Sequence, residues 1–351
     1  TKRLSATKNM PSHMTKEATV HSLLNFADLK ALTISQSSDV SIHQYLLVDL
    51  DSPCPDGGEL EQLGQWLTGQ PKIVIGFSTA QANGLELFAD VIASNPAELN
   101  RIVDQINANP VSSTVLIQVL RTTQNMPIQH ALTVESLAFS TLQSGAEFES
   151  WLGQYRKAHP QSDSSHQPDE SPAVLLSRQS DVLKVTLNRP DNQNAFSAEM
   201  RDALFEAFQL VTLDETITRA MISANGPCFC TGGDLKEFGH YNNAAEAHLI
   251  RTMRLPSRLV ADAPHRFEFH LHRACIGSGI EIPAFASRVT ATTKTYFQLP
   301  EISMGLIPGA GGCISIPRRI GSQRTAYLAL SGKRINASTA LAWGLIDSIE
   351  D

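Results

Sequence analysis

The sequence predicts an α/β protein in two parts that a polar linker joins. In the second part, segments with the pattern of buried strands alternate with segments of helical periodicity, which is the arrangement of α/β proteins. In the first part, Tyr45–Leu50 and Lys72–Phe77 have the composition of buried strands. The stretch between the parts, Arg156–Pro172, is almost free of apolar residues and holds three prolines, so it cannot build a core.

These features predict four segments. A polar N-terminal segment covers residues 1–40, an α/β region followed by helices covers 41–155, the linker covers 156–172, and a second α/β region covers 173–351. In the first α/β region we expect a helix over Glu59–Leu67 between the two strands, and then helices over 95–110, 111–121, 132–142 and up to residue 155. Asn95 followed by Pro96 is a typical helix start.

The second part begins with a strand over Asp181–Leu187 and a turn over 188–194. Ser197 then occupies the N-cap position of a helix that we expect to end near Val211, and Thr218–Ser223 is the next strand. The first part has the same order of strand, turn, helix and strand. This similarity suggests an internal half-repeat.

Composition excludes several classes of protein. The chain has 351 residues, of which 42% are hydrophobic and 18% are charged, as in globular proteins. It contains no apolar run of about 18 residues, and its start lacks the apolar core of a signal peptide, so we expect a cytoplasmic location and no membrane partner. The net charge of −7 and the absence of a basic run argue against nucleic acid. Five cysteines without a suitable spacing predict reduced thiols.

Two glutamates, Glu281 and Glu301, each stand beside a glycine-rich turn. Turns of this kind leave backbone N–H groups available, and we expect those of Gly233 and Ser278 to converge. Gly233 is placed by the sequence in a tight turn at the start of a helix, where N–H groups point at negative charge. Two N–H donors on a thioester oxygen would stabilise an enolate, and two carboxyl groups could carry its protons. Taken one at a time, the same residues are also compatible with helix caps and tight packing.

Four segments in order resemble the crotonase (enoyl-CoA hydratase/isomerase) superfamily. They are L-N-R-P-D-N-Q-N-A-F at 187–196, C-T-G-G-D-L-K-E-F at 230–238, C-I-G-S-G-I-E at 275–281, and Q-L-P-E-I-S-M-G-L-I-P-G-A-G-G at 298–312. The resemblance covers residues 173–351 and implies a spiral of ββα turns. The smaller α/β region would precede this spiral and contribute helices that pack over it.

The resemblance also implies a site and a ligand. Glu281 and Glu301 would be catalytic, the N–H groups of Gly233 and Ser278 would form the oxyanion hole, and the substrate would be an acyl-CoA. The implied substrate-binding residues are Gly233, Asp234, Leu235, Lys236 and Ala195. No metal or redox cofactor is implied, and family members assemble into homo-oligomers, as trimers or multiples of them.

Because both glutamate positions are filled, the resemblance favours an enoyl-CoA hydratase that adds water reversibly to a 2-enoyl-CoA. The alternatives in the same family are a double-bond isomerase, a thioester hydrolase and an oxygenase. A catalytically inactive acyl-CoA-binding or assembly subunit is the alternative from another class.

The chain departs from the family pattern at two places. Arg273 stands where the family has a small residue, which puts the local turn and the width of the acyl pocket in question. The chain also ends where family members continue into helices over the active site, and residues 95–152 resemble those helices. We therefore expect the first half to be a degenerate crotonase unit whose helices pack on the second half. His270 and His272 lack a third metal ligand, and 309–312 and 331–333 lack nucleotide-binding spacings.

Overall fold

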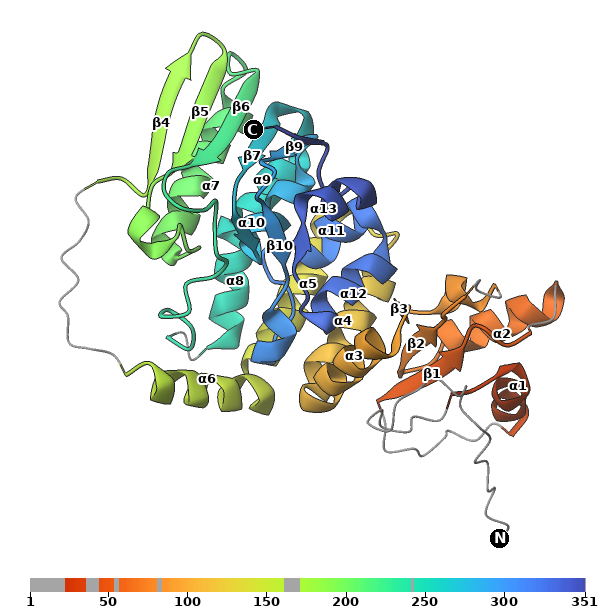
Figure 1. Ribbon diagram of the computed structural model, residues 1–351. Helices are drawn as coiled ribbons and strands as arrows, with labels where there is room; N and C mark the ends of the chain where they lie inside the picture. The colour runs from red at the N-terminus through yellow and green to blue at the C-terminus, as the bar shows by residue number, and fades with distance from the viewer. Residues whose placement is uncertain are drawn as a thin grey trace. The chain divides into compact units, whose positions relative to one another are not determined.

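The computed structural model describes residues 23–35, 44–53, 57–80, 84–160, 171–240 and 243–350. The chain divides into two compact units, residues 1–107 and residues 108–351, which are described one at a time. Most of the predicted linker, most of the predicted N-terminal segment and Cys54 lie outside the described residues. Figure 1 shows the helices and strands of both units.

The first unit is a small parallel sheet with helices. Its strands β1, β2 and β3 are adjacent in that order, with Tyr45 opposite Ile73 and Ile75 opposite Val91. A helix separates β1 from β2, which allows the two strands to run parallel. Leu46, Val48, Leu63 and their apolar neighbours form its core. The elements are α1 Phe26–Ser35, β1 Tyr45–Asp49, α2 Gly58–Thr68, β2 Ile73–Phe77, η1 Leu85–Phe88, β3 Val91–Ala93 and α3 Pro96–Ala108.

The predicted strands and helices of this unit are confirmed at these positions. Helix α1 lies inside the segment predicted as polar. The half-repeat and the degenerate crotonase origin of the first half stay predictions, although β1–α2–β2 and β5–α7–β6 of the second unit are both parallel strand–helix–strand units.

The described residues of the second unit form two sheets. A six-stranded sheet has the order β12-β9-β7-β6-β5-β4, and a three-stranded sheet has the order β11-β10-β8. Neighbouring strands are parallel except in the pairs β4–β5 and β10–β11. The strands are β4 Val174–Gln179, β5 Val182–Leu187, β6 Arg219–Ala224, β7 Phe267–Leu271, β8 Ala274–Ile276, β9 Arg288–Ala291, β10 Tyr296–Gln298, β11 Ile335–Asn336 and β12 Ser348–Ile349.

A repeated ββα turn connects these sheets. In one turn the chain passes from β7 in the large sheet to β8 in the small sheet and then into α10, Ser278–Glu281. In the next turn it passes from β9 to β10 and then into η5, Glu301–Met304. Since β9 pairs with β7 and β10 pairs with β8, successive turns stack and bring α10 near η5. The predicted crotonase-like ββα spiral is confirmed.

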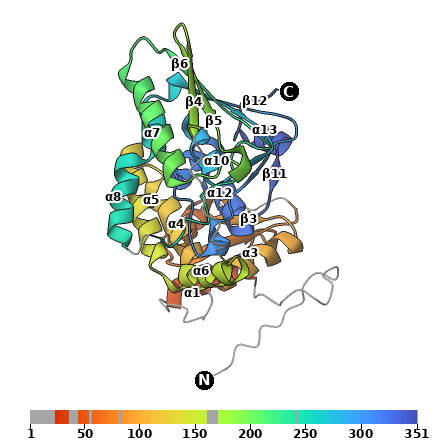
Figure 2. The same ribbon diagram turned by 90° about the vertical axis from the view of Figure 1, so that its left-hand side faces the viewer.

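Helices cover the spiral on one side. Three of them, α4 to α6, come from the part of the chain before the linker, and they pack on α8, α9, α11, α12 and η5. Figures 1 and 2 both show α5 beside α8. The main helices are α4 Pro110–Thr123, α5 Ile128–Gln143, α6 Ala146–Ala158, α7 Ala198–Leu213, α8 Ala244–Arg254, α9 Pro256–Asp262, α11 Gly312–Ile320, α12 Ser322–Ser331 and α13 Ala337–Trp343, with η2 Pro190–Asn192, η3 Pro264–Arg266 and η4 Pro283–Phe285 as short 3₁₀ turns.

Partly buried polar contacts join α5 to the rest of the unit. The side chains of Gln129 and Arg258 bond each other across α5 and α9 at 2.8 Å, and Ser136 lies 2.9 Å from His248 of α8. A Cβ on Gly309 would lie 2.3 Å from the Phe139 ring, so α5 also closes against the loop after η5. Helices α4 to α6 therefore pack on the spiral, as the sequence predicts for the helices that precede the linker.

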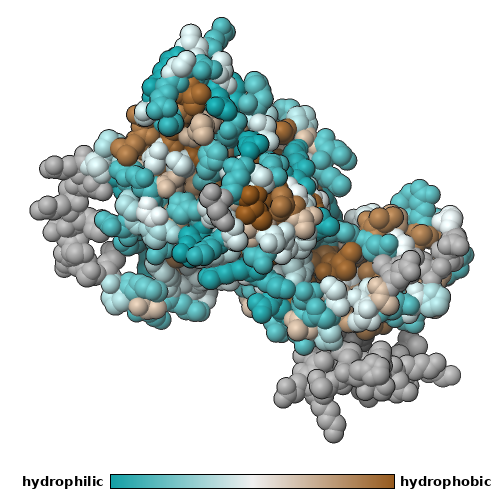
Figure 3. Space-filling model, turned by 45° about the horizontal axis from the view of Figure 1, so that its top comes forward, coloured by the Kyte–Doolittle hydropathy of each residue, from teal (hydrophilic) through white to brown (hydrophobic). Residues whose placement is uncertain are grey.

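The surface of the described residues contains both apolar and hydrophilic areas. Figure 3 shows brown apolar patches separated by larger hydrophilic areas on the visible face. Leu175 and Leu176 on the edge strand β4 are among the exposed apolar residues. None of the helices in the described ranges is long and apolar enough to cross a bilayer.

Candidate active site

The two glutamates predicted from the sequence face the same point of the backbone. Glu281 ends α10 and Glu301 begins η5, so the stacking of two ββα turns brings them together. A Cβ on Gly277 would lie 2.5 Å from Oε1 of Glu301 and 3.6 Å from Oε1 of Glu281. Gly277 has a φ of +50°, so both its conformation and the space beside it require glycine.

Glu281 is held rigidly through one of its oxygens. The side chain is buried, and its Oε2 accepts hydrogen bonds from the N–H groups of Ala310 at 2.7 Å and Gly312 at 2.9 Å. Burial raises the pKa of Glu281 to about 7, while these two backbone bonds oppose the shift because they favour the charged form. A substantial ionised fraction therefore exists near neutral pH, with Oε1 directed toward Gly277.

Glu301 has the opposite character. Its Oε2 is buried and has no hydrogen-bond partner among the described residues. Burial, and then the charge of Glu281, hold the pKa of Glu301 well above its usual value, because both disfavour the ionised form of this carboxyl group. An ionised and a protonated carboxyl group side by side are a pair suited to acid/base chemistry.

A third carboxyl group, Glu135 of α5, joins this pair and was missed by the sequence reasoning. It is 1% exposed and accepts hydrogen bonds from the N–H groups of Gly311 at 2.7 Å and Cys313 at 2.8 Å. Four successive N–H groups, from 310 to 313, thus bond alternately to Glu281 and Glu135. Burial and the charge of Glu281 raise the pKa of Glu135 to about 8. The available signal was an acidic residue on the apolar face of the helix predicted at 132–142.

The two glycine turns lie against each other. The backbones of Cys230 and Cys275, just before the turns, pair as an isolated parallel β-bridge. The N–H of Ile276 donates to the carbonyl of Cys230 at 3.0 Å. A Cβ on Gly232 would lie 3.2 Å from the carbonyl oxygen of Ile276 and 3.9 Å from the Cα of Gly277. Because these two segments run side by side in the same direction, the glycine turns that follow them lie next to each other.

The N–H groups of Gly233 and Ser278 are the ones expected to form an oxyanion hole. Neither donates a hydrogen bond to any part of the chain that the structure describes. Both residues line a pocket that Glu281 and Glu301 also line. Unpaired N–H groups beside carboxyl groups can bind a developing negative charge on a carbonyl oxygen.

The predicted helix after Gly233 is wrong. Residues 234–240 form consecutive turns, in which the N–H of Glu237 bonds the carbonyl of Asp234 at 3.0 Å and the N–H of His240 bonds the carbonyl of Glu237 at 3.2 Å. Gly239 has a φ of +77°, which does not continue a right-handed helix. The Gly233 N–H therefore belongs to a turn, and no helix terminus supports it.

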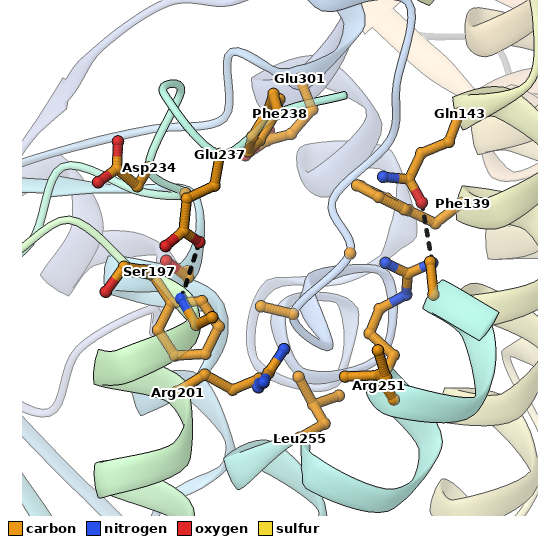
Figure 4. Close-up of a pocket in the computed structure, with 18 of the residues that line it drawn as sticks. Phe139, Gln143, Ser197, Arg201, Asp234, Glu237, Phe238, Arg251, Leu255 and Glu301 are labelled. Carbon is orange, nitrogen blue, oxygen red and sulfur yellow. Dashed lines mark hydrogen bonds between the residues drawn. The ribbon is translucent and has the colours of Figure 1, made fainter. Parts of the chain in front are cut away.

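The pocket has a volume of about 200 Å³ and lies between the spiral and helices α5, α7 and α8 (Figure 4). Of the predicted substrate-binding residues, Gly233 and Asp234 line it. Leu235, Lys236 and Ala195 do not, and their role toward CoA stays a prediction. The sequence reasoning missed the residues that helices contribute to the pocket, among them Phe139, Gln143, Arg201, Glu237 and Arg251.

Arg273 lies outside the pocket. It occupies the exposed turn between β7 and β8 with a φ of +55°, and its carbonyl accepts a hydrogen bond from Tyr296 at 2.8 Å. The residue has a glycine-like conformation, which explains why a small residue suits this position, and its side chain does not line the pocket.

The two strand histidines contact other groups. His270 lies 2.9 Å from the hydroxyl of Thr290, and His272 lies 3.2 Å from the carbonyl of Gly226. Within the described ranges, no three or more His, Cys, Asp or Glu side chains form a group that could hold a metal ion. The four cysteines in these ranges are buried free thiols.

Comparison with known proteins identifies relatives for one part of the chain. Residues 177–350 match the family profile described as Enoyl-CoA hydratase/isomerase. The chain is 33% identical to an enoyl-CoA isomerase/hydratase of Mycosarcoma maydis over 177 residues, which are 48% of this chain and 65% of the relative. It is 32% identical to the 2,3-dehydroadipyl-CoA hydratase of Escherichia coli over 180 residues, which are 50% of this chain and 68% of the relative.

Similar values relate the chain to an isomerase and to solved structures. A trans-2-decenoyl-(acyl-carrier-protein) isomerase of Streptococcus mutans is 30% identical over 177 residues, 49% of this chain and 67% of the relative. The chain thus spans about two thirds of the length of these curated relatives. A crystal structure of an enoyl-CoA hydratase from Thermoplasma volcanium has 29% identity and a TM-score of 0.48, over 52% of this chain and 73% of that one.

Proposed function

Because this chain belongs to the enoyl-CoA hydratase/isomerase family, we propose that it is an enoyl-CoA hydratase that adds water reversibly to a 2-enoyl-CoA. The supporting observation is the meeting of Glu281 and Glu301 over Gly277, next to two unpaired N–H groups. Hydration needs a base for water, an acid for the α-carbon and a site for the enolate oxygen. All three requirements have a candidate group in one pocket.

The proposed reaction assigns a role to each group. The thioester carbonyl accepts hydrogen bonds from the N–H groups of Gly233 and Ser278. Ionised Glu281 takes a proton from water as the water oxygen bonds to C3, and the π electrons move onto the thioester oxygen as an enolate. Protonated Glu301 then gives its proton to C2, and the carbonyl re-forms. Burial and the charge of Glu281 favour the protonated form of Glu301, so Glu301 is the one of the two that holds a proton for C2.

In this proposal the protein's own carboxyl and N–H groups carry the chemistry, and acyl-CoA is the substrate. The relatives include a hydratase named for a 2-enoyl-CoA, 2,3-dehydroadipyl-CoA, which supports a thioester of this class. A homo-oligomeric state also remains part of the proposal, and light scattering on the purified chain measures it.

The test is the loss of the absorbance of a conjugated enoyl thioester when crotonyl-CoA or longer 2-enoyl-CoAs are offered. We expect turnover by the wild type and losses of about 10²- to 10⁴-fold in kcat for Glu281→Gln and for Glu301→Gln, the range that general acid or base catalysis contributes. Absence of turnover with retained binding of acyl-CoA would instead support the inactive binding subunit.

A double-bond isomerase is the second candidate, and the tethering of Glu281 favours it. Since two backbone N–H groups hold Glu281, ionised Glu301 alone would take a proton from C2 of a 3-enoyl thioester and return it to C4. In that case 3-hexenoyl-CoA gains the conjugated absorbance, and Glu281→Gln retains most of this activity while Glu301→Gln loses it. For a hydratase, both variants lose hydration.

A further inference from the structure

We propose that Arg251, together with Arg201, binds a carboxylate at the far end of the acyl group, so that the substrate is the mono-CoA thioester of an unsaturated dicarboxylic acid. This inference rests on the proposed binding of an acyl-CoA in the pocket. It adds a substrate class and a specificity-determining residue.

Arg251 places a charged group in the pocket wall without a charged partner. Its guanidinium nitrogens donate to three neutral oxygens, at 3.2 Å to Ser136, 2.5 Å to Ser140 and 3.2 Å to Gln143. The group also lies 4.4 Å from the centre of the Phe139 ring. Among the described residues no carboxylate forms an ion pair with it, and its Nη1 has no hydrogen-bond acceptor.

Holding a positive charge in this position costs desolvation free energy, which an anionic ligand group would offset. Desolvation lowers the pKa of Arg251 to about 10, because the surrounding helices leave the guanidinium little contact with water. Glu135 opposes this shift but lies beyond ion-pair distance and has a raised pKa of its own. Arg251 is half-buried and has neutral hydrogen-bond partners, so a carboxylate of the ligand would supply the anion that this guanidinium lacks.

A second arginine, Arg201, adds positive charge to the same pocket. Arg201 of α7 lines the pocket with a side chain that is 17% exposed, and its nearby charge also lowers the pKa of Arg251. Its Nε and Nη2 bond the carboxylate of Asp202 at 2.9 and 3.1 Å, and its Nη1 has no acceptor in the described ranges. Figure 4 shows the Arg201 guanidinium in the lower part of the pocket, the Arg251 guanidinium on the right beside Gln143, and Glu301 at the upper end.

Two acidic residues besides the proposed catalytic pair line the pocket, and neither forms an ion pair with Arg251 or Arg201 in the described ranges, although the charge of Arg201 lowers the pKa of Glu237 against the larger effect of burial. Glu237 accepts a hydrogen bond from the N–H of Ala198 at 2.8 Å, and Asp234 accepts one from the side chain of Asn192 at 2.9 Å. The rest of the lining near the arginines is apolar, with Phe139, Phe196, Ala247, Ile250 and Leu255. A ligand that matches this pocket has a thioester at the glutamates, an apolar stretch and an anion at the arginines.

Two substrates with acyl chains of equal length distinguish recognition of the acyl end from recognition of CoA. The wild type is assayed with trans-2-hexenoyl-CoA and with 2,3-dehydroadipyl-CoA, which share the CoA group and differ in a terminal methyl or carboxylate. We expect a higher kcat/KM for the carboxylate-bearing substrate, and a drop of this ratio by about 10- to 100-fold in Arg251→Met, as expected for loss of a hydrogen bond to a charged group. Arg251→Lys keeps the charge without the planar fork and gives an intermediate ratio.

A binding experiment keeps the inference independent of catalysis. Calorimetry with the unreactive adipyl-CoA and hexanoyl-CoA compares the same two acyl ends, and we expect tighter adipyl-CoA binding that Arg251→Met and Arg201→Met both weaken. Thermal unfolding of each variant detects any loss of the contacts that join α8 to α5. If neither enoyl-CoA reacts while adipyl-CoA is preferred, the proposed hydration fails and the inference stands.

Two results would overturn the inference. Equal kcat/KM and equal affinity for the two acyl ends in the wild type would mean that no carboxylate is recognised, even if hydration proceeds. Equal losses on both substrates in Arg251→Met would mean that the arginine supports the shared CoA phosphates or the fold. Either result leaves the roles of Glu281 and Glu301 unaffected.

Discussion

The substitution Gly277→Ala tests the geometry on which the site depends. Gly277 has a φ of +50° and a ψ of −122°, a region that residues with a side chain rarely adopt. Its added Cβ would lie 2.5 Å from Oε1 of Glu301, well inside the 3.4 Å at which ordinary contact begins. The substitution therefore combines backbone strain with a displaced carboxyl group.

The expected magnitudes follow from these two effects. Strain in a sparsely populated backbone region costs about 1–3 kcal/mol of stability. The Glu301 carboxyl group has to move by about 1 Å, and a displacement of that size costs on the order of a hundredfold in rate. We expect both losses together in Gly277→Ala.

Gly332→Ala is the matched control. Gly332 has a φ of +57°, and a Cβ there would meet no atom within 4 Å. The control introduces backbone strain away from the pocket, so it lowers stability by about 1–2 kcal/mol and leaves kcat unchanged. Urea unfolding followed by circular dichroism measures stability, and the fall of enoyl-thioester absorbance measures kcat for both variants.

The reasoning is refuted if Gly277→Ala folds and retains a kcat within a few-fold of Gly332→Ala. Such a result would mean that Glu301 does not need its observed position. A loss of activity in Gly277→Ala with stability equal to the control would still separate the catalytic effect from the fold.

Four further predictions concern titration, buried hydrogen bonds and backbone strain. The kcat/KM of hydration rises with pH as Glu281 ionises near pH 7 and falls again where Glu301 loses its proton; a profile that is flat from pH 6 to 9 contradicts these roles. Glu135→Gln costs about 1–3 kcal/mol in urea unfolding, because an amide offers one acceptor oxygen to two buried N–H groups. Since burial raises the Glu135 pKa from 4.5 to about 8, wild-type stability falls as pH rises across that range, and Glu135→Gln makes the fall shallower. Arg273→Gly raises stability by about 1 kcal/mol and leaves kcat unchanged, as thermal unfolding and the absorbance assay will show.

Local sequence signals located most of the secondary structure. Ser197 accepts a hydrogen bond from the N–H of Met200 at 3.1 Å, so the N-cap that predicts the start of α7 is present in the structure. The helix predicted after Gly233 failed because the glycine at 239 interrupts helical geometry, and the turns there are completed by contacts with α6, whose Leu152 lies next to Gly239. Segments with few local contacts are the ones that propensity describes least well.

The pocket residues that come from helices could not be located from the sequence. Glu135 bonds Gly311 and Cys313 across most of the chain, and no local pattern specifies which helix meets the 310–313 loop. Arg251 has a helical context typical of a solvent-facing residue, and only the packing of α8 against α5 desolvates it. The predicted domain limits and the predicted roles of the site residues stay predictions.

By itself the sequence determined the family, the ββα spiral and the pair Glu281 and Glu301, because motifs that bind a carbonyl oxygen or fix a turn are local and depend on glycine and carboxyl groups at set spacings. Only the tertiary structure decided which N–H groups remain unpaired, which carboxyl groups have raised pKa values and which arginines line the pocket. These properties depend on burial and on neighbours distant in sequence, since desolvation and charge act through space.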